Sequence, residues 1–194
     1  MRIKKIWMLA VLLTAPQWLG AQPEGFALSF GGLASKAYTS ILLKPNGGFG
    51  VSGALEYGFS DWFSAGVDVG LVEYIAPTGQ ADMKSAWADL TGRFFPFPAS
   101  GLGQPYWQVG FGFSPFVAGL FEDYWPNYAA AQSGLPLSSG VIYWNAQTSL
   151  GYRFFLSPNW ALDTDAQYNL FWPPATPRLQ TLSFETRLVL FLGK

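Results

Sequence analysis

Residues 142–154 read IYWNAQTSLGYRF and carry the strictest period of two in the chain. One row of side chains, from Ile142 to Phe154, is almost wholly apolar, and the alternate row, from Tyr143 to Arg153, is mostly polar or small. Successive side chains of a β-strand point to opposite faces of the strand. The stretch therefore predicts a strand with one apolar face and one polar face.

Seven further stretches of the chain alternate in the same way. In one pair, the alternation from Phe49 to Tyr57 breaks at Ser60 and resumes from Phe63 to Leu71, which is typical of a β-hairpin. The eight predicted strands lie within residues 26–30, 49–57, 63–71, 86–94, 107–114, 142–154, 160–170 and 182–192.

Short and long connections follow each other along the chain. The short ones lie around Ser60 and at residues 96–103 and 157–159, and longer ones fall near residues 36–48, 75–84, 115–140 and 173–178. An even number of strands with alternating short turns and longer loops is the organisation of outer-membrane barrels. The sequence predicts an all-β fold, an eight-stranded antiparallel up-and-down transmembrane β-barrel.

The charge content favours a membrane barrel over a soluble one. Of the 194 residues, 50% are hydrophobic and only 12% are charged, against about 25% charged in ordinary soluble domains. A soluble barrel turns its apolar rows inward and covers its outer face with charged side chains. Here the polar rows consist mainly of Gly, Ser, Ala, Thr, Asn and Gln, which suit the narrow interior of an eight-stranded barrel.

The first 21 residues have the pattern of a secretory signal peptide. Basic residues at Arg2, Lys4 and Lys5 precede an apolar run of about ten residues, and small residues end at Ala21. The run is too short for a membrane-spanning helix, which needs about 20 residues. We expect residues 1–21 to be cleaved and residues 22–194 to form the barrel in the bacterial outer membrane.

Nine charged residues fall on the predicted inward rows. Six are carboxylates and three are arginines, and buried charges must find partners. We expect them to form a hydrogen-bonded ionic network in the barrel interior, made of Glu56, Asp68, Asp89, Arg93, Arg153, Asp163, Asp165, Glu185 and Arg187.

Aromatic residues gather near the predicted strand ends. Such rings prefer the interface between lipid and water, so we expect an aromatic girdle rather than ordinary core packing. Its predicted members are Tyr57, Trp62, Phe63, Tyr74, Phe94, Phe95, Trp107, Tyr152, Phe154, Trp160, Phe171 and Trp172.

The longest predicted loop, residues 115–140, is also rich in aromatic residues. Phe121, Tyr124, Trp125 and Tyr128 are candidates for contact with a partner or with lipopolysaccharide. The alternative is a loop that folds over the mouth of the barrel or lies at the membrane interface.

The pattern over residues 22–194 resembles the outer-membrane β-barrel superfamily that includes the OmpA-like membrane domain and the OmpX and OmpW types. Residues 50–57 and 151–155 and the last strand resemble strands of that superfamily. The resemblance implies export, contact with lipid and lipopolysaccharide, and assembly by the barrel-insertion machinery. The chain departs from the superfamily at its end, where Phe191 is followed by three further residues instead of ending the chain.

Several kinds of chemistry are excluded by composition. The chain has no histidine and no cysteine, and the enzymes of this superfamily, such as lipid A deacylases, palmitoyl transferases and omptin-type proteases, rely on histidine. Asp163 and Asp165 share one face of a strand, but nearby arginines give both a structural use. We expect no enzyme activity, no cofactor and no metal site, and the net charge of −1 without a basic stripe argues against nucleic acid.

Two functions remain open, with a soluble periplasmic ligand-binding barrel as a third possibility. The first is a structural or surface-interaction role through the extracellular loops, with a possible surface partner and a monomeric barrel. The second is a narrow channel for small or hydrophobic solutes, for which small inward residues would leave a cavity at Gly50, Ala54, Gly66, Gly70, Gly110 and Gly112.

Overall fold

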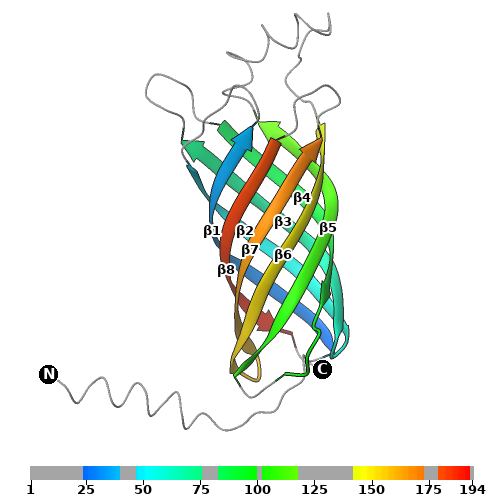
Figure 1. Ribbon diagram of the computed structural model, residues 1–194. Coiled ribbons are helices and arrows are strands. Elements are labelled where there is room, and N and C mark those ends of the chain that lie inside the picture. The colour runs from blue at the N-terminus through cyan, green and yellow to red at the C-terminus, as the bar shows by residue number, and fades with distance from the viewer. Residues whose placement is uncertain are drawn as a thin grey trace, which may run out of the picture.

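The computed structural model is a closed barrel of eight antiparallel strands in which every strand pairs with its neighbours in sequence and β8 pairs with β1 (Figure 1). It describes residues 24–39, 47–75, 83–99, 102–117, 142–172 and 179–192. The prediction of the fold is confirmed. The strands are β1 (Gly25–Thr39), β2 (Gly47–Ser60), β3 (Phe63–Ile75), β4 (Met83–Phe94), β5 (Gly103–Val117), β6 (Ile142–Ser157), β7 (Trp160–Trp172) and β8 (Leu179–Phe191).

The two ends of the barrel differ. The described short connections, between β2 and β3, β4 and β5, and β6 and β7, lie at the end where β1 begins and β8 ends (Figure 1). We call this the turn end and the opposite one the loop end. Backbone hydrogen bonds from Phe95 N to Trp62 O and from Phe191 N to Asn159 O, both 2.9 Å long, tie the connections of the turn end together. In the described residues, no helix is long and apolar enough to cross a membrane.

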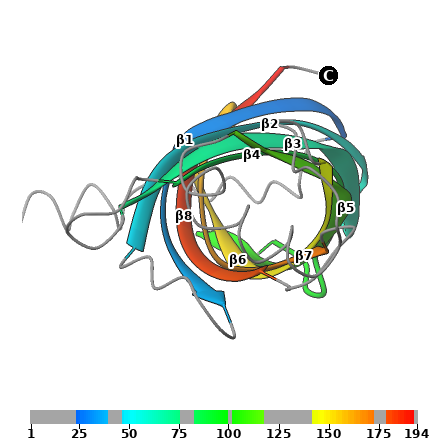
Figure 2. The same cartoon turned by 90° about the horizontal axis from the view of Figure 1, so that it is seen from above.

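Seen from above, the strands form a ring around the interior of the barrel (Figure 2). The alternation seen in the sequence becomes the difference between the outside and the inside of this ring. In β8, Phe184 is 63% exposed, whereas its neighbours Ser183 and Glu185 are 4% and 3% exposed. The same holds around the wall, where outward Leu90 and Leu150 are the most exposed side chains at mid-strand. The outer face is therefore apolar and the interior polar, the reverse of a soluble barrel.

The inward glycines on which the alternative of a channel depends have no free space beside them. A Cβ on Gly70 would overlap the ring of Trp87, and one on Gly110 would lie 2.6 Å from Cγ of Gln147. At Gly50, Gly66 and Gly112 the neighbouring backbone already fills the space. The interior of an eight-stranded barrel is narrow. Glycine at these positions lets the backbone and side chains of neighbouring strands approach closely.

A pair of glycine variants tests this packing. Gly112→Ala places a Cβ against the carbonyl oxygen of Ala88 and 2.7 Å from Cα of Asp89, so we expect it to lower the free energy of unfolding by about 1 to 3 kcal/mol. Gly32→Ala is the control, because its Cβ would have no neighbour nearer than 3.8 Å. Urea unfolding of the protein in detergent micelles measures both. Equal stability of the two variants would contradict the close packing.

Three aromatic residues assigned to the girdle lie inside the barrel instead. Tyr74, Phe95 and Phe171 are 2%, 2% and 3% exposed, and the Tyr74 hydroxyl lies 3.2 Å from Oγ of Ser35. Tyr74 and Phe171 belong to the inward rows of β3 and β7, and Phe95 follows the last residue of β4. Their closeness to a strand end correctly predicted that they lie near an end of the barrel. Whether a side chain points inward or outward depends instead on the alternation along the strand.

Other aromatic rings do form an outer row at the turn end. The ring centroids of Phe26 and Tyr57 are 4.9 Å apart, those of Tyr57 and Phe59 are 4.9 Å apart, and those of Phe63 and Phe94 are 5.0 Å apart. These distances are typical of aromatic pairs. The row extends over β1 to β4, at the height where an interface would lie.

A small apolar core closes the interior at the turn end. Ala27, Ala161, Val189 and Phe191 are buried together, and Phe155 packs against them. The sequence reasoning missed this cluster, although its members belong to the inward rows. The interior is therefore filled by apolar side chains at the turn end and by polar ones above them.

Candidate functional site

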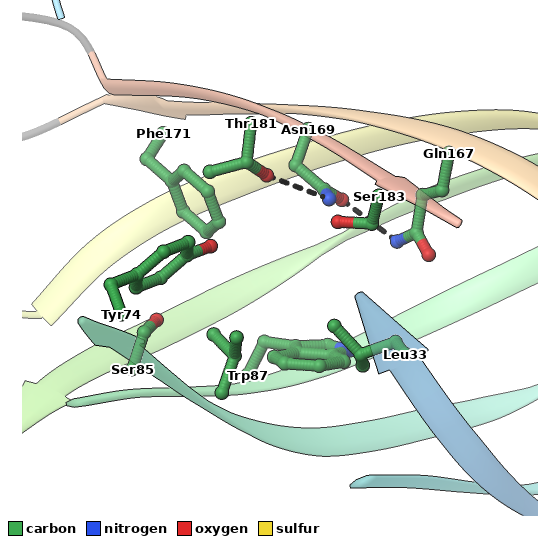
Figure 3. Close-up of a pocket in the computed structure, with 10 residues that line it drawn as sticks. Leu33, Tyr74, Ser85, Trp87, Gln167, Asn169, Phe171, Thr181 and Ser183 are labelled. Atoms are coloured by element: carbon green, nitrogen blue, oxygen red, sulfur yellow. Dashed lines mark hydrogen bonds between the residues drawn. The ribbon is translucent and has the colours of Figure 1, made fainter. Parts of the chain in front are cut away.

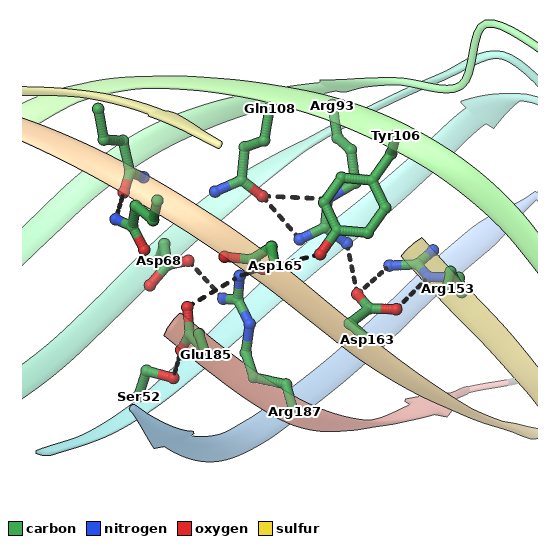
Figure 4. A network of polar contacts seen from close by, with 12 residues as sticks. Ser52, Asp68, Arg93, Tyr106, Gln108, Arg153, Asp163, Asp165, Glu185 and Arg187 are labelled. Carbon is green, nitrogen blue, oxygen red and sulfur yellow. Dashed lines mark hydrogen bonds and ion pairs between the residues drawn. The ribbon is translucent and has the colours of Figure 1, made fainter. Parts of the chain in front are cut away.

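The nine charged residues predicted for the interior all point into the barrel, and the structure brings them together in the half nearer the turn end. Figure 4 shows all of them except Glu56 and Asp89. The nine residues come from six strands that surround the lumen. Glu56 lies on β2, Asp68 on β3, Asp89 and Arg93 on β4, Arg153 on β6, Asp163 and Asp165 on β7, and Glu185 and Arg187 on β8.

Four of these residues, Glu56, Arg93, Arg153 and Asp163, form what we call the paired group. Arg153 binds Asp163 in a bidentate manner, with Nε 2.8 Å from Oδ1 and Nη2 2.9 Å from Oδ2. Its Nη1 also lies 3.2 Å from Oε1 of Glu56. Arg93 Nη1 is 2.8 Å from Asp163 Oδ2 and 2.8 Å from Glu56 Oε2. Two arginines thus face two carboxylates, and the formal charges balance.

Neutral side chains complete the coordination of the two arginines. Arg93 donates from Nε and Nη2 to Oε1 of Gln108, over 3.0 and 2.7 Å, and its Cζ lies 4.3 Å from the centroid of the Tyr106 ring. Arg153 Cζ lies 5.3 Å from the ring centroid of Phe95. Bidentate and charge-assisted bonds are the strongest hydrogen bonds in proteins. The paired group is therefore a fixed layer across the lumen.

The other five charged residues, Asp68, Asp89, Asp165, Glu185 and Arg187, form the acid-rich group. Arg187 lies 2.5 Å from Asp68, 3.4 Å from Glu185 and 3.5 Å from Asp165. Asp89 has no arginine against it among the described residues. This group holds four carboxyl groups and one guanidinium, so its formal charges do not balance.

Tyr106 joins the two groups. Its hydroxyl donates to Oδ2 of Asp165 over 2.8 Å, while its ring lies against Arg93 of the paired group. Tyr106 and Gln108 were not predicted as members of the network. Their positions are in the inward row of β5, two residues apart, so the period of two was the signal that could have found them.

Above the charged residues, the interior toward the loop end is lined by amides, hydroxyls and aromatic rings (Figure 3). Asn169 receives a hydrogen bond from Gln167 over 2.8 Å and donates to Thr181 over 3.1 Å. The cavity between these side chains, Tyr74 and Trp87 has a free volume of about 10 Å³. That is about the volume needed for one water molecule, so this cavity holds no space for a larger solute.

Four predicted residues lie outside the described residues. They are the loop candidates Phe121, Tyr124, Trp125 and Tyr128. In the part of the chain that is described, no three Asp or Glu side chains are placed so that they could hold a metal ion.

The comparisons with known proteins agree with the geometry at the level of fold. No model of a known protein family and no curated protein matches the sequence. The crystal structure of Neisserial surface protein A matches with a TM-score of 0.64 and 15% identity, over 87% of this chain and 98% of the other. OprG, an outer membrane protein of Pseudomonas aeruginosa, matches with a TM-score of 0.55 and 15% identity, over 88% and 97% of the two chains.

A third similar structure is Ail, the attachment invasion locus protein of Yersinia pestis. Its TM-score is 0.51 and its identity is 14%, over 87% of this chain and all of the other. The three matches cover the whole barrel of each structure or nearly so. The chain therefore has the fold of the small eight-stranded barrels of bacterial outer membranes.

Proposed function

We propose that the protein is a small outer-membrane barrel with a closed lumen, which acts through its extracellular loops in a structural or surface-interaction role. The observation that carries this proposal is the paired group. Arg93 and Arg153 extend into the lumen from β4 and β6 and meet Glu56 and Asp163 from β2 and β7. Bonds from four strands close the lumen at this layer. A barrel with a closed lumen serves to anchor its loops in the membrane.

The outer face supports a membrane location. Leu71, Leu90 and Leu150 lie at or beyond mid-strand and are 58%, 72% and 68% exposed. Soluble monomers rarely expose continuous apolar surface of this extent. The outward charged residues Lys36 and Glu73 lie near the loop end of their strands, as expected where an apolar band meets the lipid headgroups.

The closed interior argues against the alternative of a narrow solute channel. The apolar core fills the turn end, the paired group crosses the lumen above it, and the cavity described beyond it holds about one water molecule. Passage of a solute would have to break bidentate bonds between buried charges, at a cost of several kcal/mol.

A surface role is supported by the arrangement of the connections. All connections described in the structure are at the turn end, so the longer ones join strands at the loop end. The names of two similar barrels refer to the surface and to attachment. We propose lipopolysaccharide or a surface partner as the ligand of the loops, contacted by Phe121, Tyr124, Trp125 and Tyr128.

The test combines conductance with binding. In planar bilayers we expect the purified protein to give no stable conductance steps. We expect replacement of the four loop aromatics by serine to weaken binding to lipopolysaccharide-containing vesicles by at least tenfold, since aromatic anchors commonly contribute more than about 2 kcal/mol. The control carries Tyr57→Ser at the turn end. Stable channels in the unmodified protein would contradict the closed lumen, and unchanged binding in the loop variant would contradict the ligand proposal.

A further inference from the structure

Two carboxylates of the acid-rich group occupy directly opposed positions on neighbouring strands. Asp68 on β3 and Asp89 on β4 are paired in register, and they are 2% and 1% exposed. Like charges at directly opposed positions of a sheet destabilise it. Because the pair is also buried, both groups cannot remain ionised without strong repulsion.

The surrounding charges do not compensate the pair. Arg187 on β8 is the one cation that contacts the acid-rich group among the described residues, and it lies 2.5 Å from Asp68. Its Nη2 is divided between Glu185 of β8, at 3.4 Å, and Asp165 of β7, at 3.5 Å. One guanidinium thus serves three carboxyl groups before Asp89 is counted.

The other neighbours of the pair are neutral. Opposite Asp68 on β2 stands Ala54, and opposite Asp89 on β5 stands Gly112. From β6, Asn145 donates Nδ2 to Oδ2 of Asp89 over 2.6 Å. Oδ1 of Asp68 and Oδ1 of Asp89 are both buried without a hydrogen-bond partner. These two oxygens belong to the two carboxyl groups that repel each other.

We propose that Asp68 and Asp89 share one proton in the folded barrel. The proton comes from water when the chain folds and forms an O–H bond with one of the two carboxyl groups. It removes one of the two opposed charges. The pair then carries a single negative charge, which faces Arg187.

The proposal predicts how the stability of the barrel depends on pH. An aspartate of the unfolded chain is ionised at neutral pH, so the folded state binds one proton more than the unfolded state. Stability must then fall as the pH rises. Each pH unit in this range increases the unfolding equilibrium constant by up to tenfold for one proton. The chain has no histidine and no cysteine, so no ordinary side chain titrates between about pH 6 and pH 8.

Asp89→Asn is the decisive variant. Its amide keeps an acceptor for Asn145 and carries no charge, as a protonated Asp89 would. We expect Asp89→Asn to be as stable as the unmodified protein at about pH 6 and to lose the rise in the unfolding constant between about pH 6 and pH 8. The matched control is Asp163→Asn, which removes a carboxylate held by two arginines and is expected to destabilise the barrel at every pH.

Urea unfolding in detergent micelles at several pH values measures these effects, with Na⁺ and Ca²⁺ varied at constant ionic strength. The infrared band of a protonated carboxyl group, present in the unmodified barrel and absent in Asp89→Asn, is the second readout. It keeps the proposal testable if the variant does not fold. Three results would overturn the shared proton. They are an equal pH dependence of the unmodified protein and Asp89→Asn, absence of the infrared band from the unmodified protein, and a stability that follows the metal ion and not the pH.

Discussion

Replacement of Arg153 by methionine is expected to lower the free energy of unfolding by about 3 to 5 kcal/mol. The guanidinium is fully buried and holds both oxygens of Asp163 and one side of Glu56. Methionine fills a similar volume but leaves these carboxylates with Arg93 alone. The loss is large because one arginine cannot balance two buried carboxylates. Urea unfolding of the protein in detergent micelles, followed by tryptophan fluorescence, measures it.

Two further variants distinguish this effect from a general sensitivity to substitution. Lys36→Met removes a charge from the exposed outer face near the loop end, and we expect a change below about 1 kcal/mol. The double variant Arg153→Met with Asp163→Asn is expected to lose less stability than the sum of the losses of the two single variants. The reason is that either substitution alone already removes the interaction between the two side chains. Strict additivity would mean that the observed ion pair contributes nothing to stability.

Replacement of Leu150 by arginine is expected to destabilise the barrel by about 2 to 4 kcal/mol. Leu150 lies at the middle of β6 with its side chain outward and 68% exposed. In a bilayer this position faces hydrocarbon, where an arginine is costly, whereas in water the same substitution would change little. Equilibrium unfolding from lipid vesicles is the measurement.

Leu102→Arg is the matched control for this prediction. Leu102 is 67% exposed, close to the value of Leu150, but it lies in the connection before β5 at the turn end. A cost of about 0 to 1 kcal/mol is expected there, as near an interface. Equal and small effects of the two substitutions would indicate that the outer face meets water, and the soluble periplasmic barrel would then be the better interpretation.

The separation of the interior into two groups gives the residues different roles. In the paired group, two arginines and two carboxylates are held by short bonds, and Gln108 accepts from Arg93. In the acid-rich group, Arg187 has a single short bond, to Asp68. The first group fixes the closed layer, whereas in the second the shared proton reduces the excess of negative charge.

The sequence by itself determined the strands and their two faces. A period of two, as in residues 142–154, places side chains on opposite faces whatever the tertiary structure. The low charge of the polar rows then assigned the apolar face to the outside. For the same reason, all nine charged residues could be placed in the interior from their rows alone, as Asp163 and Arg187 illustrate.

Only the tertiary structure decided which inward residues meet. Arg153 and Glu56 are 97 positions apart in sequence, and their contact depends on the curvature and stagger of the closed wall. The same closure filled the space at Gly70 with the ring of Trp87 and put Asp89 opposite Asp68 without an arginine. Period and composition fix the face of each side chain, but partners across the lumen depend on strand register and barrel closure, which act between segments far apart in the chain.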